Sequence, residues 1–472
     1  MSDWDGLLAT ALVGTGRRAP RDDVLAGVVE PGALPVEGPE AEVLASAAVL
    51  AVYRRAGWVP PTWQGERPAP AGPDTRPECS ETAAQLLELL LERGVRMDGG
   101  NAALTEHWLR ACVAAGRRPP ARLLVSLLQT ATVETSLREA ARDAAGPRGA
   151  WLAVRNRRWS WAAAVDVNGT EGDVGERFAT AARAERLALL TALRRTDPAG
   201  ARELVEGTWP SEQAASRAAL LDALGTGLSD ADEDFLESAL ADRAATVRAA
   251  AAALLDRLPR SRRARRMAAR VEALTRPDGG IALPAEPDAG ARADGITDQR
   301  EPGHGLRASW LIQLVGAAPL PPVRDPRGEP GELVAGWTRA ALRQRHHDWL
   351  ATLAEATPTA ELLGALPPER AAAIVAVQPS VDARFAGLLA ACPGPWPATF
   401  SADVVARLRG VRTDRLLTLA YPALAERLHP AALPDVDDWL EATAREQRAR
   451  RRMLRGLAHA LTIRRTIEQE FS

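Results

Sequence analysis

The amino-acid sequence predicts an all-α fold in which short helices stack on one another as an α-solenoid. Two observations predict it: a pattern of residues that recurs every 31 positions, and a composition dominated by alanine, leucine and arginine. All three are strong helix formers. A period near 30 with two helices per unit is typical of a solenoid, in which each unit buries its apolar stripe only against its neighbours.

The repeat centres on residues 235–259, which predict two short helices joined by a turn. Asp242, Ser211 and Thr180 lie 31 residues apart, and all three are residue types that cap helix N-termini. The other members of the pattern are three arginines, three leucines and further large apolar residues: Arg186, Arg217, Arg248; Leu193, Leu224, Leu255; Phe178, Trp209, Leu240; Leu204, Phe235. We expect Leu224 to be buried between repeat units because it occupies this phased position.

The acid at the turn and the arginine six residues later are specific to certain repeat families. Asp242 with Arg248 resembles the Asp–Arg ladder that ties adjacent HEAT and armadillo repeats together. The alternative is an isolated, capped amphipathic helix with a solvated arginine, but three phased copies favour the repeat. We therefore predict that Arg248 pairs with Asp242 or with the equivalent acid of a neighbouring repeat.

Proline-rich and glycine-rich stretches divide the chain. We predict an N-terminal helical segment, a Pro-rich linker, HEAT-like helical repeats, an irregular insertion with one short helix, and a C-terminal helical region. Their residues are 1–58, 59–79, 80–276, 277–332 and 333–472, and the short helix is 307–316. In the C-terminal region we expect helices over 333–356, 360–377, 383–391, 402–409, 415–428 and 436–471. Ser80, Asp197 with Pro198, and Ser229 with Asp232 are expected to begin helices.

Charge and composition exclude several classes of protein. The formal net charge is −2, so bulk charge gives no support for nucleic-acid binding. Every basic side chain except histidine is an arginine, which indicates a GC-rich bacterial genome. Cys79, Cys112 and Cys392 lie far apart and are expected to be small buried residues in a reducing compartment. With no signal-peptide pattern and no apolar run of about 18 residues, we expect a cytoplasmic protein.

No motif carries recognisable catalytic or metal-binding chemistry. The glycines at 14 and 16 stop a helix and lack the pattern of a phosphate-binding loop. No histidine has a partner four residues on, and residues 346–349 are expected to begin a helix at the surface. We therefore expect a non-catalytic protein with no catalytic, cofactor-binding or metal-binding residues and no cofactor.

Two arginine-rich stretches are the strongest polar signals. Residues 257–270 carry seven arginines and no acid, and residues 445–455 carry six arginines against one glutamate. Each is either a solvated face whose charge complements a helix C-terminus or a docking face for an acidic partner or phosphate. The first is the better candidate interaction surface, with members Arg257, Arg260, Arg262, Arg263, Arg265, Arg266 and Arg270. Reversing Arg262, Arg263 and Arg266 to glutamate is expected to leave the fold intact, because exposed charges contribute little to stability.

A second candidate surface interleaves aromatic and basic residues. Its members are Trp151, Arg155, Arg157, Arg158, Trp159 and Trp161. Such a segment could stack on and grip a nucleic acid, as in the HEAT-like DNA glycosylases, or it could be a packing cluster between helices. Packing is the simpler interpretation, because tryptophan supplies 13 of the 20 aromatic residues of the chain (13 Trp, 2 Tyr and 5 Phe).

Several stretches together resemble a bacterial family, domain of unknown function 5691. They are Trp4 with residues 11–17, and the segments 151–161, 239–251 and 307–320. The resemblance implies no catalytic residue. It implies a scaffold or adaptor that works with a MoxR-type AAA+ ATPase and a von Willebrand A-domain protein, in gene neighbourhoods that also hold a SWIM zinc-finger protein. We therefore expect a non-catalytic scaffold for protein–protein interaction, the alternative being a DNA-acting, glycosylase-type HEAT-like protein. Membrane association is not expected.

Overall fold

The computed structural model describes residues 3–20, 25, 28–29, 36–57, 68–92, 101–163 and 174–472. Every regular element in this part of the chain is helical, so the predicted all-α class is confirmed. Two isolated bridges, Glu78 with Arg118 and Thr275 with Ile281, are the other backbone pairings of β type. The chain divides into two compact units, Met1–Pro70 and Ala71–Ser472, and the division falls inside the predicted Pro-rich linker.

The smaller unit contains two helices that pack on each other. They are α1 (Asp3–Val13) and α2 (Pro39–Ala56), and both lie within the N-terminal helical segment that the sequence predicts. Leu7 of α1 packs with Val43 and Leu50 of α2, and Trp4 covers this small core. Gly14 follows α1 with φ of 89°, the left-handed conformation that lets glycine end a helix.

The larger unit begins with four helices around one apolar core. They are α3 (Glu81–Leu91), α4 (Asn101–Ala114), α5 (Leu124–Val133) and α6 (Arg138–Arg155). Ser80 caps α3 by accepting the backbone N–H of Ala83 at 3.0 Å, as the sequence predicts. Trp108 of α4 is fully buried, and its indole N–H donates to the carbonyl of Ala83.

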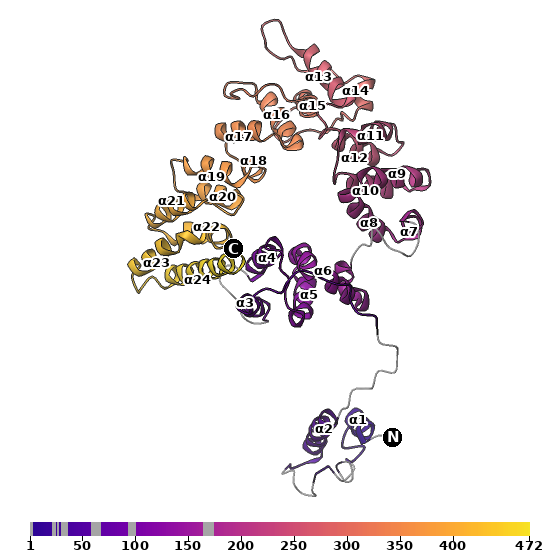
Figure 1. Cartoon of the computed structure of the whole chain (residues 1–472), viewed down its shortest axis with the longest axis vertical. Helices are drawn as coiled ribbons and strands as arrows, with labels where there is room; N and C mark the ends of the chain where they lie inside the picture. The colour runs from indigo at the N-terminus through magenta and orange to yellow at the C-terminus, as the bar shows by residue number, and fades with distance from the viewer. Residues whose placement is uncertain are drawn as a thin grey trace. The chain divides into compact units, whose positions relative to one another are not determined.

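Helices α7 to α12 carry the 31-residue pattern (Figure 1). They are α7 (Val174–Thr180), α8 (Arg183–Thr196), α9 (Pro198–Thr208), α10 (Ala214–Leu224), α11 (Glu233–Ala239) and α12 (Ala245–Leu255). Helices α8, α10 and α12 begin 31 residues apart and pack in succession, α8 on α10 and α10 on α12. The interval found in the sequence is therefore the interval between structural elements.

Two of the predicted N-caps in this region are wrong. The hydroxyls of Thr180 and Ser211 donate backward, to carbonyls of the preceding helical turn, and do not cap the helices that follow. Asp242 does accept a backbone N–H, that of Ala244 at 2.8 Å, but the N-cap residue of α12 is Ala244 and not Asp242. The caps predicted at Asp197 and at Ser229 with Asp232 are confirmed.

Leu224 is fully buried in the core that α8 to α12 share, as its phased position predicts. Leu224→Ala is expected to lower the free energy of unfolding by about 2–5 kcal/mol, because the lost methyl groups leave a cavity between close-packed helices. Thermal unfolding of the purified variant measures this loss. An unchanged melting temperature would contradict the packing; Leu419→Ala, at an exposed leucine, is the control and should change little.

The irregular stretch predicted over 277–332 contains two helices, not one. The expected helix is α15 (Leu306–Ala317), nearly all of whose residues are buried, and a short helix α14 (Ala289–Ala293) precedes it. Trp310 and Leu314 of α15 pack with Met267 of α13 (Arg262–Leu274). The irregular stretch therefore packs against the helix that precedes it.

Three of the helices predicted in the C-terminal region are each two helices. The elements are α16 (Gly331–Gln344), α17 (His347–Ala356), α18 (Ala360–Gly364), α19 (Pro368–Ala376), α20 (Ala383–Ala391), α21 (Ala398–Arg409), α22 (Asp414–Arg427), α23 (Leu433–Ala442) and α24 (Arg448–Phe471). Arg345 separates α16 from α17 because it adopts a left-handed conformation with φ of 51°. Pro367 and Pro368 separate α18 from α19, and Thr443 ends α23.

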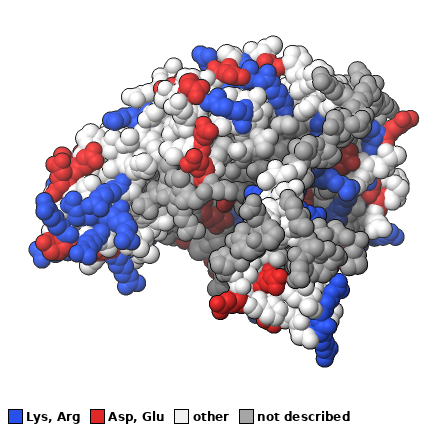
Figure 2. All heavy atoms as spheres, turned by 90° about the horizontal axis from the view of Figure 1, so that it is seen from below, with Lys and Arg blue, Asp and Glu red and all other residues white. Residues whose placement is uncertain are grey.

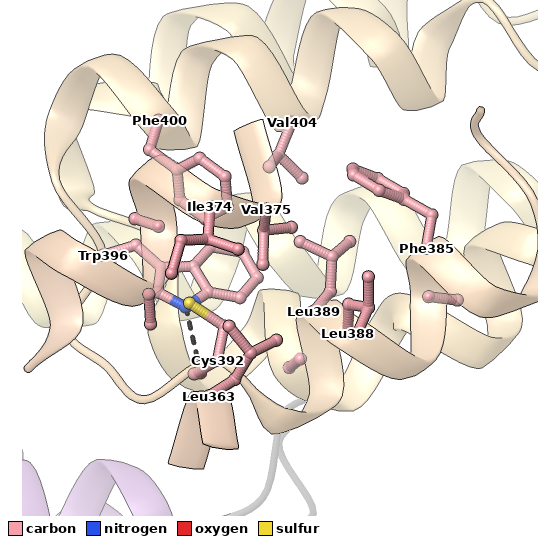
Figure 3. Close-up of a cluster of buried hydrophobic side chains, with 14 of the residues drawn as sticks. Leu363, Ile374, Val375, Phe385, Leu388, Leu389, Cys392, Trp396, Phe400 and Val404 are labelled. Atoms are coloured by element: carbon pink, nitrogen blue, oxygen red, sulfur yellow. Dashed lines mark hydrogen bonds between the residues drawn. The ribbon is translucent and has the colours of Figure 1, made fainter. Parts of the chain in front are cut away.

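A single large core runs through α15 to α24. Figure 3 shows part of it, where Trp396 and Phe400 pack over Ile374 and Cys392. The indole N–H of Trp396 donates to the carbonyl of Cys392 at 3.3 Å, so this buried polar atom is satisfied. Cys112 and Cys392 are buried and Cys79 is half-buried, and none forms a disulfide.

The last helix connects the two ends of the larger unit. Leu454, Leu457 and Leu461 of α24 belong to the core of the C-terminal helices. Further along the same helix, Ile463 and Ile467 belong to the core of α3 to α6. Figure 1 shows the C-terminus beside α4 accordingly. Residues far apart in the sequence are thereby held together within this unit.

Candidate functional site: a charged pocket beside the arginine-rich segment

A pocket lies among α12, the start of α13, α15 and α16, with the loop 295–304 along one side. Its volume is about 680 Å³. Alanines from α12 form one wall, while the other walls carry arginines, carboxylates and Gln313. A pocket with this lining is charged, and its properties depend on how those charges are paired.

Asp256 is the centre of the buried charge. It is 3% exposed and forms ion pairs with Arg263 from α13 and Arg343 from α16. Burial lowers the pKa of Arg263 to about 10, which still leaves the guanidinium charged at neutral pH. Burial likewise lowers the pKa of Arg343. One carboxylate thus holds α12, α13 and α16 together, and removing it would leave two guanidinium groups without their partner.

A second carboxylate, Asp294, binds the outer part of α13. It accepts hydrogen bonds from Arg266 at 3.0 Å and from Arg270 at 2.6 Å. Burial opposes ionisation of Asp294, but the hydrogen bonds from these two arginines outweigh it and lower its pKa. The hydrogen bond to Asp294 in turn raises the pKa of Arg266. This network fixes the loop after α14 against α13.

The loop 295–304 is held by side chains of α15 and α16. The amide of Gln313 accepts the backbone N–H of Thr297 at 2.9 Å and donates to the carbonyls of Thr297 and Gln299. Glu301 pairs with Arg339 of α16. The pocket wall is therefore an ordered part of the fold.

The structure changes the interpretation of the arginine-rich segment 257–270. Arg263 is buried and Arg266 and Arg270 are bound to Asp294, so these three arginines form internal contacts rather than an open basic face. Arg257 donates to the carbonyl of Gly225 at the end of α10. The remaining arginines, Arg260, Arg262 and Arg265, are exposed.

Even the exposed arginines of this segment mostly have partners on neighbouring elements. Arg260 pairs with Asp230, and Arg262 pairs with Glu233 and Asp234. The expectation that this charge complements a helix C-terminus is wrong for α13, because the helix begins at Arg262 and has no basic residue in its last turn. Acids of the preceding repeat neutralise it instead.

Arginine–acid pairs link α8 to the start of α10 and α10 to the start of α12, but the predicted pair at Arg248 is not among them. Arg186 pairs with Glu212 at 2.5 Å, and Arg217 pairs with Asp242 at 2.9 Å. Each arginine therefore binds the acid that precedes the next phased helix. Arg248, by contrast, donates to the backbone carbonyls of Asp242 and Arg243 and does not pair with the Asp242 carboxylate. The third phased arginine lacks the acid that the first two use.

Some side chains of the aromatic and basic segment 151–161 are packed in the interior, and others are exposed. Trp159 is buried with Leu128 and Ala153, and Trp161 packs against the same cluster. The indole N–H of Trp161 donates to Thr132. These contacts favour the packing interpretation for both tryptophans.

The other members of that segment lie nearer the surface. The guanidinium carbon of Arg155 lies 3.8 Å from the centre of the Trp151 ring, and Arg155 also donates a hydrogen bond to the backbone carbonyl of Trp151. Arg157 and Arg158 are exposed. An arginine already stacked on the tryptophan leaves less of that ring for a nucleic-acid base.

The structure brings together no recognisable catalytic set. Among the described residues, no group of three or more His, Cys, Asp or Glu side chains could hold a metal ion. His346 and His347 lie at the exposed start of α17, where His346 accepts the backbone N–H of Trp349. No helix in the described ranges is long and apolar enough to cross a bilayer.

Sequence reasoning missed Asp256, Asp294, Arg339 and Arg343. Each is a single charged residue with no motif around it, and its partner comes from a different part of the fold. The segment 307–320 was selected for its resemblance to a family, and it contains Gln313, which holds the pocket wall. That resemblance was the available signal for this side of the site.

These features define an all-α protein with a pocket lined by paired charges. The chain belongs to a family of unknown function, DUF5691, whose model matches residues 6–471. The family resemblance of the sequence is thereby confirmed. No curated protein and no solved structure shows significant similarity to the chain.

Proposed function

We propose that the protein is a non-catalytic scaffold, a HEAT-like α-solenoid that uses its helical-repeat surface for protein–protein interaction. One observation carries the proposal: α8, α10 and α12 follow one another at 31-residue intervals, and arginine–acid pairs connect successive repeats. Stacked helix pairs of this kind create extended surfaces that suit binding of a protein partner.

The charged pocket fits the same function. Asp256 and Asp294 are engaged by arginines, and these pairs join elements separated along the chain. Buried pairs of this kind hold a scaffold in one arrangement. A hydrolytic site would instead need a nucleophile with an adjacent base or a carboxylate free to take a proton.

The partners we propose are a MoxR-type AAA+ ATPase and a von Willebrand A-domain protein encoded near this chain. The test mixes the purified full-length protein with each purified partner and measures complex formation by size-exclusion chromatography with light scattering. The expected result is a stable complex with at least one of them. Elution of all components as separate species would overturn this assignment.

A parallel measurement tests the DNA-acting alternative. The protein is applied to a column carrying duplex DNA and eluted with increasing salt. A scaffold for proteins should elute at low salt, because it lacks the phosphate contacts that hold a DNA-binding protein on the column. A DNA-binding protein is released only when the salt concentration is high enough to weaken those contacts. Retention at physiological salt, together with release of a base from DNA, would favour the glycosylase-type function.

A further inference from the structure

Most arginines of the larger unit have a structural role that the structure makes plain. A recurring one is to bind backbone carbonyls at the C-terminus of another helix, where the last carbonyls have no partner within the helix. Arginines of the C-terminal region that do so, with the carbonyl each binds, are Arg407 (Ala376), Arg427 (Ala390), Arg451 (Leu440) and Arg464 (Leu428). Arginines that have neither such a bond nor an acidic partner have no structural role of this kind.

The first half of α24 contains three arginines that have neither an acidic partner nor a hydrogen bond to a carbonyl. Arg448, Arg452 and Arg455 are exposed, and in the described part of the chain none of them has an ion pair or a side-chain hydrogen bond. They lie at positions i, i+4 and i+7, so they share one face of the helix over about 10 Å. The opposite face, with Arg450 and Leu454, is buried.

The position of these arginines in the helix adds an energetic argument. Because α24 begins at Arg448, this arginine lies in the first turn of the helix, where the helix dipole disfavours positive charge. The sequence-based explanation, charge that complements a helix C-terminus, is therefore wrong here as well. In α13 the same disadvantage is offset by acids such as Glu233 and Glu237, whereas Asp414, which binds the first turn of α24, pairs with the buried Arg450 and not with the exposed Arg448.

Two more exposed arginines lie near α24, at the start of α22. Asp414 binds Arg450 at 2.7 Å and Thr418 contacts Met453, so the start of α22 lies beside the first turns of α24. The exposed residues Arg412 and Arg415 belong to that start. Figure 2 shows basic side chains gathered at the edge where Figure 1 places α23 and α24, with acidic side chains next to them.

Those acidic side chains restrict what the face can bind. Helix α23 packs on α24 and exposes only acids among its charged residues: Asp435, Asp437, Asp438 and Glu441. A long, uniformly anionic partner such as a DNA duplex would meet this repulsion. Base stacking is also disfavoured, because Trp439 is buried and Phe471 packs on Trp108. A short anionic segment of a protein avoids both difficulties.

We propose that the basic face of α24, formed by Arg448, Arg452 and Arg455, docks an acidic helical segment of a partner protein. Carboxylates spaced by three or four residues along the partner helix would match the spacing of the three arginines on α24. Arginine forks bind carboxylates bidentately, which gives such a contact specificity as well as attraction. This inference rests on the proposed scaffold function and names the chemistry of one partner.

The test titrates two labelled peptides of identical composition with the full-length protein, at low and at physiological salt. One peptide places glutamates at i, i+4, i+7 and i+11 of a helix, and the other distributes them around it. The in-register peptide is expected to bind about tenfold more tightly, with affinity falling as salt rises. Equal binding of the two peptides, or no binding of either, overturns the proposal.

Two triple variants locate the binding. Arg448, Arg452 and Arg455 are replaced by glutamine in one, and the control replaces the exposed Arg243, Arg300 and Arg384. The first should weaken the in-register peptide about tenfold or more, without lowering the melting temperature, because it removes positive charge from a helix N-terminus. The control should bind as the wild type does. Equal losses in both variants would contradict the proposal.

Two further probes separate this proposal from other anions and from the scaffold function. Tighter binding of a mixed-sequence DNA duplex or of phosphatidylserine vesicles than of the in-register peptide, at the same salt, overturns it. If the α24 variant still forms the complex with the ATPase or the A-domain protein, while the peptides do not bind, the scaffold function stands and only this surface is refuted.

Discussion

Replacing Asp232 by alanine is expected to destabilise the larger unit by about 3–5 kcal/mol, because it leaves a buried guanidinium without its counter-charge. Asp232 is fully buried and binds both terminal nitrogens of Arg194, at 3.0 and 2.8 Å. It also accepts the backbone N–H of Ser229 in the capping box and contacts Arg202. All these interactions are lost together.

The surroundings of Arg194 make the effect larger than that of an ordinary ion pair. The side chain is 1% exposed, and it also donates to the carbonyls of Thr226 and Gly227 after α10. It joins α8 to the turn that leads into α11. Without Asp232 the charge stays inside the protein with carbonyls as its only acceptors, and these offset its desolvation only in part.

A matched control lies two residues away. Asp230 is in the same turn but pairs with Arg260 at the surface, where an ion pair contributes little. Asp230→Ala should therefore leave the melting temperature almost unchanged, while Asp232→Ala lowers it markedly. Both are measured by thermal unfolding of the purified proteins. Similar melting temperatures for the two variants would refute the importance of the buried pair.

The sequence predicts helices well here because their signals are local. Apolar spacing, prolines and capping residues place α2, α9 and α20 with small errors, since each signal lies within or beside the helix it defines. The breaks that were missed have weaker signals. Arg345 and Thr443 are neither glycine nor proline, and only the tertiary packing of the flanking helices requires a turn there.

The charged site could not be predicted in the same way. The partners of Asp256 come from α13 and from α16, which is almost ninety residues further along the chain (Arg343 minus Asp256 is 87). The segment 257–270 has a conspicuous composition, yet composition does not reveal that Asp294 neutralises two of its arginines. An arginine cluster in a sequence becomes a binding surface only if no acid of the fold reaches it. On the face of α24 that Arg448, Arg452 and Arg455 share, none of the described acids does, and on α13 several do.

Arg263→Glu is expected to be strongly destabilising, in contrast to the expectation from sequence that reversing arginines in this segment leaves the fold intact. The side chain is 3% exposed, pairs with Asp256 and donates to the carbonyl of Asp294 at 2.8 Å. A glutamate there would bury a second carboxylate beside Asp256 and remove the donor for that carbonyl. We expect a loss of about 4–5 kcal/mol or more, at the upper end for single substitutions.

The same substitution at Arg265 provides the control, because this exposed side chain has no acidic partner and donates only to the carbonyl of Arg260. Arg265→Glu should change the melting temperature little. Since a unit of this size can open in parts, hydrogen exchange of the backbone amides of α12, α13 and α16 is measured alongside thermal unfolding. Arg263→Glu should accelerate exchange in all three helices, because Asp256 joins them. Protection equal to that of the Arg265→Glu variant would show that the Asp256 network does not hold these helices together.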